Sequence, residues 1–215
     1  ASLVQSVEME KDIDLVMFKP SPCFNKIPEY CVKGILARMP ESNKMMFRDI
    51  LFADEKGLKS VDDFMSYIFQ FFATRLAFSY QNSHIDVFTQ KGLIEFYKTG
   101  FLSDHFYGIP PFNLEERKML LKFLLDRNND KSDTYRMYIL NIEYETGIPA
   151  IVVYKNRNIL FEFDGIGQKL QNENPCLLEL QGMSNAFCDF AENYIPYHMA
   201  LSEEEANNFI NSLIG

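Results

Sequence analysis

The sequence predicts an α+β fold: a central buried helix, a mainly helical N-terminal two-thirds, and an antiparallel three- to four-stranded sheet near the C-terminus. Two observations carry this prediction. Residues 60–81 are dense in large apolar side chains at helical spacing, and from Thr134 the pattern changes to β-rich runs separated by turn residues. We expect a single domain over residues 1–215, with a helical part at 1–133 and a sheet with terminal helices at 134–215 as the alternative subdivision.

The predicted central helix begins after Ser60, a good N-cap, with Asp63 three residues later in the position of a capping box. On a helical wheel, its large apolar side chains cover more than half of the circumference, which is wider than a surface helix needs. They are Phe64, Met65, Tyr67, Ile68, Phe69, Phe71, Phe72, Leu76, Phe78 and Tyr80. The side chains on the rest of the wheel are small or uncharged, so a second layer of structure could pack against them. We therefore predict a helix that is buried on most sides.

Arg75 falls inside this apolar arc, beside Phe64, Ile68 and Phe72. A buried guanidinium keeps its charge, so it needs a carboxylate, backbone carbonyls or a ligand anion as a partner. One interpretation is a structural ion pair, or a side chain that extends past the aromatic rings to water. The other makes Arg75 the anchor of an anionic ligand in an aromatic-lined pocket.

The segments around this helix alternate between regular structure and breaks. Residues 12–19 alternate loosely before Pro20 and predict a strand, whereas residues 27–39 and 42–56 predict two helices. We interpret residues 82–86 as a polar break. Residues 89–100 place Leu93 and Phe96 on one helical face and end in Gly100, which predicts a helix, with a strand over residues 94–98 as the alternative.

Residues 101–112 contain Gly108, Pro110 and Pro111, which are typical of loops, but also several aromatic side chains. We therefore expect a loop that packs against the rest of the protein. Asp104, His105 and Tyr107 place an acid, a base and a hydroxyl group beside apolar rings. This loop is the second candidate site, and a packed structural loop is the alternative interpretation.

The last hundred residues predict a helix, then a sheet, then two helices. Asn113 and Glu116 form a capping-box start to an amphipathic helix. Four β-rich runs follow at residues 134–144, 148–154, 158–163 and 176–180, for which we expect an antiparallel meander. A helix over residues 184–195 and a last one capped by Ser202 complete the prediction.

Charge and cysteine usage limit the partners and the compartment. The net charge is −9, and residues 134–215 carry four basic against eleven acidic side chains, so we expect no direct nucleic-acid binding. Residues 64–80 contain too many polar groups for a membrane span. The N-terminus lacks a signal-peptide pattern, and the four cysteines include no C-x-x-C pair, so we expect reduced thiols in a cytoplasmic protein.

Motifs for metal or cofactor binding are weak. Asp126, Asn128, Asp130 and Ser132 resemble the start of an EF-hand loop, but Lys131 and Met137 stand where it needs glycine and glutamate. His84, His105 and His198 are far apart, although Asp86 lies near His84. We expect no metal and no cofactor.

Residues 147–165 are similar to the back half of a thioredoxin-like domain, and residues 93–101 to its central strand. No C-x-x-C follows Phe96, and the chain leaves no room for a helix before Gly147. We interpret the similarity as chance.

The function that these observations favour is a non-catalytic ligand-binding or regulatory domain, which could also form homo-oligomers. Its expected ligand is small and anionic or amphipathic, and its candidate binding residues are Arg75, His105, Tyr107 and Phe72. One alternative is a hydrolase whose site is assembled from dispersed residues, including His105 or His84. The other is a structural or oligomer-forming protein. The sequence names no catalytic residue.

Overall fold

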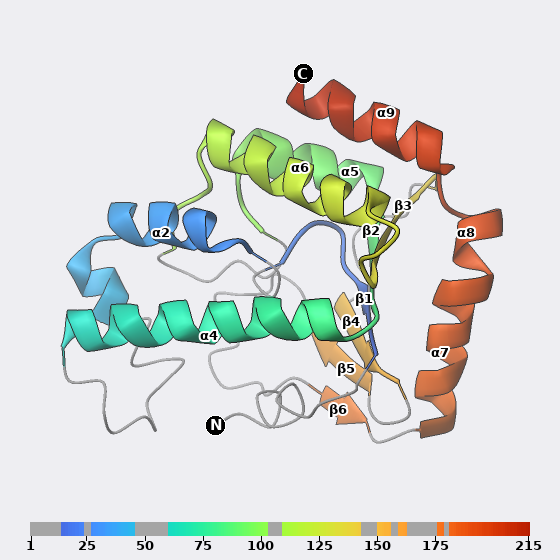
Figure 1. The fold of residues 1–215 in the computed structure, drawn as a ribbon, viewed down its shortest axis with the longest axis horizontal. Helices are drawn as coiled ribbons and strands as arrows, with labels where there is room; N and C mark the ends of the chain where they lie inside the picture. Colours follow the sequence, from blue (N-terminus) through green and yellow to red (C-terminus); the bar gives the residue numbers. More distant parts are fainter. Residues whose placement is uncertain are drawn as a thin grey trace.

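The computed structural model describes residues 14–23, 27–45, 60–102, 109–142, 150–155, 159–162, 176–178 and 181–215 (Figure 1). The candidate residues His105 and Tyr107 lie outside these ranges, as does most of the segment predicted as a helix at 42–56. The elements are β1 (Leu15–Phe18), α2 (Glu29–Arg38), α4 (Val61–Gln81), β2 (His84–Thr89), α5 (Gln90–Thr99), α6 (Leu114–Asn129), β3 (Tyr135–Leu140), β4 (Ala150–Tyr154), β5 (Ile159–Glu162), β6 (Cys176–Leu178), α7 (Gln181–Asn193), α8 (Ile195–His198) and α9 (Glu203–Ile214).

The sheet is mixed, with the strand order β3-β2-β1-β4-β5-β6. β1, β2 and β3 run parallel, while β4, β5 and β6 are antiparallel to their neighbours. The predicted antiparallel sheet near the C-terminus is therefore wrong, although the α+β content is confirmed. Helices α2 and α4 connect β1 to β2, and α5 and α6 connect β2 to β3, which are the long crossovers that parallel strands require.

Strand β2 is the element that the sequence interpretation missed. It occupies part of the predicted polar break at 82–86, and all six of its residues are buried. His84 and Asp86 lie on the same side of the strand because side chains alternate along it. Their polarity interrupted the apolar pattern that a buried parallel strand normally shows.

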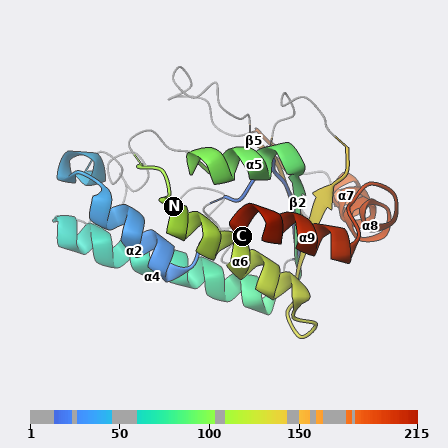
Figure 2. The ribbon, with the colours of Figure 1, turned by 90° about the horizontal axis from the view of Figure 1, so that it is seen from above.

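The sheet separates two cores. On one face, Phe88, Met137 and Ile139 pack with apolar side chains of α2, α4, α5, α6 and α9. On the other face, Val16, Val87 and Val153 pack against Cys188, Ala191 and Ile195 of α7 and α8. Figures 1 and 2 show α7 and α8 on one side of the strands, with α2, α4 and α6 on the other.

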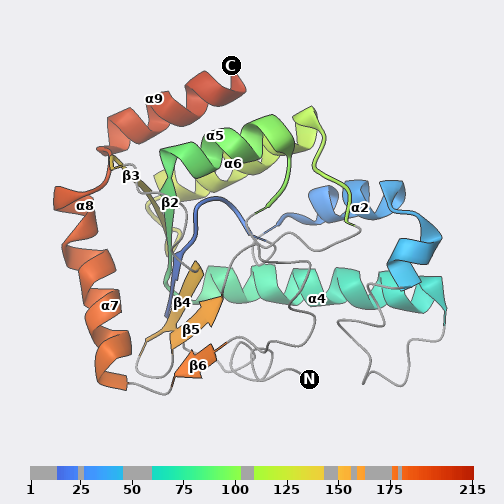
Figure 3. The ribbon, with the colours of Figure 1, turned by 180° about the vertical axis from the view of Figure 1, so that it is seen from behind.

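Helix α4 is not the central helix, buried on most sides, that the sequence predicts. Its capping box at Ser60 and Asp63 is confirmed, and Phe64 and Ile68 belong to the larger core. However, Ala73 and Ala77 are exposed, and Tyr80 keeps 49% of its surface. Figure 3 shows α4 extending away from the sheet beneath α2 and α6. Of the apolar side chains that the sequence places on α4, only some pack against other elements among the described residues.

Predictions based on local capping are confirmed. Thr89 caps α5, and Gly100 ends it with a left-handed φ of 78°, so the alternative strand at 94–98 is wrong. Capping boxes also begin α6 and α9 at Asn113 and Ser202. Helix α7 begins earlier than predicted, and Pro196 lies in the first turn of α8 and does not end the helical segment.

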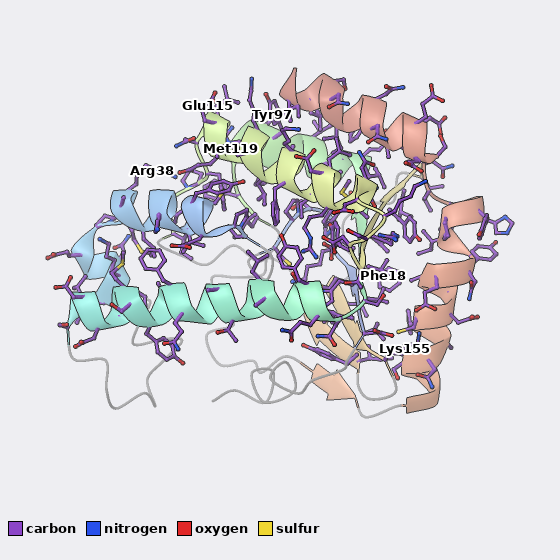
Figure 4. All side chains as sticks on the ribbon, viewed as in Figure 1. Phe18, Arg38, Tyr97, Glu115, Met119 and Lys155 are labelled. Carbon is purple, nitrogen blue, oxygen red and sulfur yellow. The ribbon has the colours of Figure 1, made fainter. Side chains whose placement is uncertain are left out.

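An ion pair between Glu116 and Arg38, which is labelled in Figure 4, joins α6 to α2. The Arg38 guanidinium donates from its two terminal nitrogens to Glu116 Oε1 and Oε2, at 2.5 and 2.7 Å. Glu116 Oε2 also accepts from the Asn113 N–H at 2.9 Å. Gly34 makes this contact possible, because a Cβ there would lie 2.0 Å from Glu116 Oε1.

Candidate functional site

A groove of about 260 Å³ lies between α2 and the C-terminal half of α4. The side chains along it come from one stripe of α4 and from the start of α2. Phe69, Ala73, Leu76, Ala77 and Tyr80 line it from α4, and Ile27, Glu29 and Val32 line it from the other side. The side chains of the two alanines are too small to fill the space between the helices, so the groove stays open.

The walls of the groove are apolar and its rim is charged. Lys33 pairs with Glu29 at 2.5 Å, and its ammonium lies 5.8 Å from the centroid of the Phe69 ring. Outside the groove lining, the buried Arg127 guanidinium lies 4.1 Å from the centroid of the Tyr80 ring. The groove therefore suits a ligand with an apolar body whose polar head group lies near the exposed Glu29–Lys33 pair.

The sequence-predicted site residues have mixed positions. Phe72 and Arg75 belong to α4, within the stretch that lines the groove, but their side chains lie outside the description. Phe64 and Ile68, the expected neighbours of Arg75, are buried in the larger core and do not line the groove. His105 and Tyr107 are not described. The assignment of Phe72, Arg75, His105 and Tyr107 as binding residues therefore stays a prediction.

A polar cluster surrounds the buried Arg127 and is the second candidate site in the structure. Its Nε and one terminal nitrogen donate to the two Asp133 carboxylate oxygens at 2.6 and 2.8 Å. The terminal nitrogens also donate to the Ser79 hydroxyl and carbonyl, each at 2.9 Å. Arg127 thereby joins the last turn of α4 to the loop before β3. Burial acts to raise the pKa of Asp133, but the hydrogen bonds from Arg127 and from the Tyr135 N–H outweigh it and lower that pKa.

The cluster continues into the sheet through Tyr135, whose hydroxyl donates to Asp86 Oδ2 at 2.9 Å. Burial, with the nearby Asp86 carboxylate, raises the pKa of Tyr135 well above its ordinary value, so the phenol keeps its proton and remains a donor. His84, on the same strand, is only 2% exposed. A substrate in solvent does not reach His84 in this conformation, which weakens the case for hydrolysis at that residue.

Sequence reasoning missed Arg127 and Tyr135 as partners. Arg127 stands in the last turn of α6, where a basic residue is commonly explained by the helix dipole. Tyr135 resembled an ordinary strand aromatic. Nothing in either local pattern indicates the long-range contacts with Ser79 and Asp86.

The residues that resemble an EF-hand start serve the turn between α6 and β3. Asn128 Oδ1 accepts from the Met137 N–H at 2.7 Å, and Asp130 Oδ1 accepts from the Ser132 N–H at 2.9 Å. Within the described ranges, no group of three or more His, Cys, Asp or Glu side chains is placed to hold a metal ion. Among the helices searched, including the 21-residue α4, none has the length and apolarity to cross a membrane.

Comparison of the chain with protein-family models, with curated proteins and with solved structures gave no match.

Proposed function

We propose that this protein is a non-catalytic ligand-binding or regulatory domain, and that the groove between α2 and α4 receives a small amphipathic ligand. The observation that carries the proposal is the open apolar groove itself, formed where Ala73 and Ala77 face α2. The polar cluster around Arg127 is a poorer candidate, because its groups are buried and bonded to one another.

The size of the groove limits the ligand. A volume of about 260 Å³ is just below the range of roughly 300–1,000 Å³ that is usual for small-molecule sites. The ligand is accordingly a small molecule or one chain of a larger lipid-like molecule, held mainly by contact with Val32, Phe69 and Leu76. Affinity from so few contacts is expected in the micromolar to millimolar range.

The charge of the ligand depends on the cations near the groove. Lys33 is already paired with Glu29, so an anionic head group has to compete for it. Arg75, the anchor that the sequence predicts for such a head group, shares its helical face with Phe64 and Ile68 and not with the groove-lining residues Leu76 and Tyr80. Because Glu29 is the charged residue in the groove lining and Lys33 is paired with it, we expect an anionic amphiphile to bind no more tightly than its neutral analogue unless Arg75 reaches the head group.

A pair of fluorescent probes tests the proposal. We would titrate the protein with anionic 1-anilinonaphthalene-8-sulfonate and with neutral N-phenyl-1-naphthylamine. Ala77→Leu fills the groove and is expected to weaken binding of both probes at least fivefold. Ala37→Leu makes the same change at an exposed position of α2 that does not line the groove, and is expected to leave both affinities unchanged.

Arg75→Met separates the groove from its predicted anchor. If Arg75 holds the anionic head group, this variant weakens binding of the sulfonate probe and spares the neutral probe. Equal binding of both probes by wild type and Ala77→Leu would refute the assignment of the groove as the binding site.

A further inference from the structure

A row of exposed aromatic rings lies on the outer surface of α7 and α8. Phe190 and Tyr194 stack with ring centroids 5.3 Å apart and an interplanar angle of 18°, and the Tyr194 and His198 rings are 4.5 Å apart. Tyr197 lies one turn beyond Tyr194. We call these four residues, Phe190, Tyr194, Tyr197 and His198, the aromatic ladder.

The ladder continues across the junction between the two helices. The N–H groups of Tyr194 and His198 donate to the Phe190 and Tyr194 carbonyls, each at 3.1 Å, so helical bonding connects α7 to α8 in spite of Pro196. Residues four apart therefore stay on one face. The ladder is thus held on two helices joined at Tyr194, which is itself a turn residue between α7 and α8.

The opposite side of these helices packs against the sheet. Cys188, Ala191 and Ile195 are buried against the sheet, and Phe18 meets Phe187 edge to face at 5.9 Å. Figure 4 shows Phe18 and Lys155 between the strands and α7. The ladder itself faces solvent, with 37% of Phe190, 48% of Tyr194 and 77% of Tyr197 exposed. Aromatic rings with this much exposure in one row are typical of a contact surface.

The charge around the ladder selects its partner. Residues 181–215 contain five acidic side chains and no lysine or arginine. Glu192 is paired with Lys155 at 2.9 Å, whereas Asp189 is exposed and accepts a hydrogen bond from Asn193. The surface therefore offers aromatic faces beside the exposed Asp189 carboxylate, and the acidic first turn of α9 follows α8 in the chain.

We propose that the aromatic ladder binds an arginine- or lysine-rich segment of another protein. Guanidinium and ammonium groups stack favourably on tyrosine and phenylalanine faces, and nearby carboxylates add attraction. A second copy of this chain fits less well, because two such surfaces would bring the exposed Asp189 carboxylates of both copies together and offer each ladder no cation to stack on. Nucleic acid and anionic lipid are repelled for the same reason.

Fluorescence anisotropy with labelled octa-arginine as the probe tests this proposal on the 215-residue chain at 0.15 M salt. Tyr194→Ser/Tyr197→Ser removes two rings and is expected to weaken binding about tenfold. Tyr194→Phe/Tyr197→Phe keeps the rings and is expected to change it less than twofold. Asp189→Asn is expected to weaken binding two- to threefold, while Glu115→Gln, the same charge change on an exposed site of α6, is expected to have little effect.

Two further measurements make the result decisive. Urea midpoints confirm that the variants fold, and light scattering after gel filtration reports self-association. The proposal is overturned if wild type does not bind octa-arginine, or if the serine variant binds it as tightly as wild type. It is also overturned if the phenylalanine variant loses as much affinity as the serine variant. A wild-type dimer that the serine variant abolishes would assign the surface to a second copy instead.

Discussion

Substituting Gly34 by alanine is expected to destabilise the protein, although alanine is the better helix former. Gly34 lies within α2, where its missing side chain admits the Glu116 carboxylate of α6. An added Cβ would lie 2.0 Å from Glu116 Oε1 and 3.4 Å from a terminal nitrogen of Arg38. The carboxylate then has to move, and it loses alignment with Arg38 and with the Asn113 N–H.

Two opposing effects set the size of the change. Replacing glycine by alanine inside a helix stabilises it by about 1 kcal/mol. Breaking a fully buried ion pair costs about 3–5 kcal/mol, but the Arg38 side chain is 35% exposed and solvent screens part of that loss. Taking the ion-pair loss as about 2–3 kcal/mol, we expect Gly34→Ala to lower the free energy of unfolding by about 1–2 kcal/mol.

A double-mutant cycle isolates the cause. Urea unfolding of wild type, Gly34→Ala, Glu116→Ala and the double variant gives the four free energies by linear extrapolation. In the Glu116→Ala background the obstruction is absent, so Gly34→Ala is expected to stabilise the protein by up to about 1 kcal/mol. Gly182→Ala serves as a matched control, since no heavy atom beyond its immediate surroundings lies within 4 Å of the added Cβ.

The sign of the change is the decisive result. If Gly34→Ala stabilises the protein in both backgrounds, the steric argument is wrong. If it destabilises both equally, the obstruction does not come from Glu116, and the role given to this carboxylate in joining α2 to α6 fails.

Two other predictions concern protonation. Because the pKa of Asp133 is lowered in the folded protein, its contribution to stability is present above the unfolded value of about 3.9 and is lost as the pH falls through the folded value. The free energy of unfolding should therefore decrease as the pH is lowered below about 4. In urea titrations at several pH values, Asp133→Asn should make this decrease smaller. If the free energy of unfolding depends on pH equally in wild type and Asp133→Asn, the assignment to Asp133 is wrong. Burial raises the pKa of the Cys31 thiol to about 12 and that of the Cys188 thiol to about 11. Iodoacetamide at pH 8 should leave both unmodified in the native protein and modify both in urea, as mapped by mass spectrometry; rapid native modification of either thiol would contradict its burial.

What the sequence predicts correctly here is local. The capping boxes at Ser60, Asn113 and Ser202, and the left-handed glycine at position 100, involve residues at most a few positions apart. Their hydrogen bonds depend on local backbone geometry, so residue types at fixed spacing are sufficient to predict them. The same reasoning favoured a helix over a strand at residues 90–99.

Strand pairing could not be predicted in this way. β3 pairs with β2 and not with β4, its neighbour in sequence, and β1 pairs with both β2 and β4. The two polar side chains of β2 hid it because their partners come from elsewhere: Asp86 accepts from Tyr135, which lies 49 residues away. A polar residue in a buried strand can be recognised only when the position of that partner is known.

The misplacement of α4 has a physical origin that bears on the proposed function. The wide apolar arc was assigned wholly to the interior, yet it divides between two environments. Phe64 and Ile68 enter the core, while Phe69, Leu76 and Tyr80 face the groove. A second apolar sector is stabilising only if something covers it, and Ala73 and Ala77 are too small to fill the space between α4 and α2. Apolar surface that the described part of the chain leaves uncovered is what a bound amphipathic molecule would bury. If Ala77→Leu raised the free energy of unfolding and left binding of the fluorescent probes intact, this excess would be a packing defect and not a site.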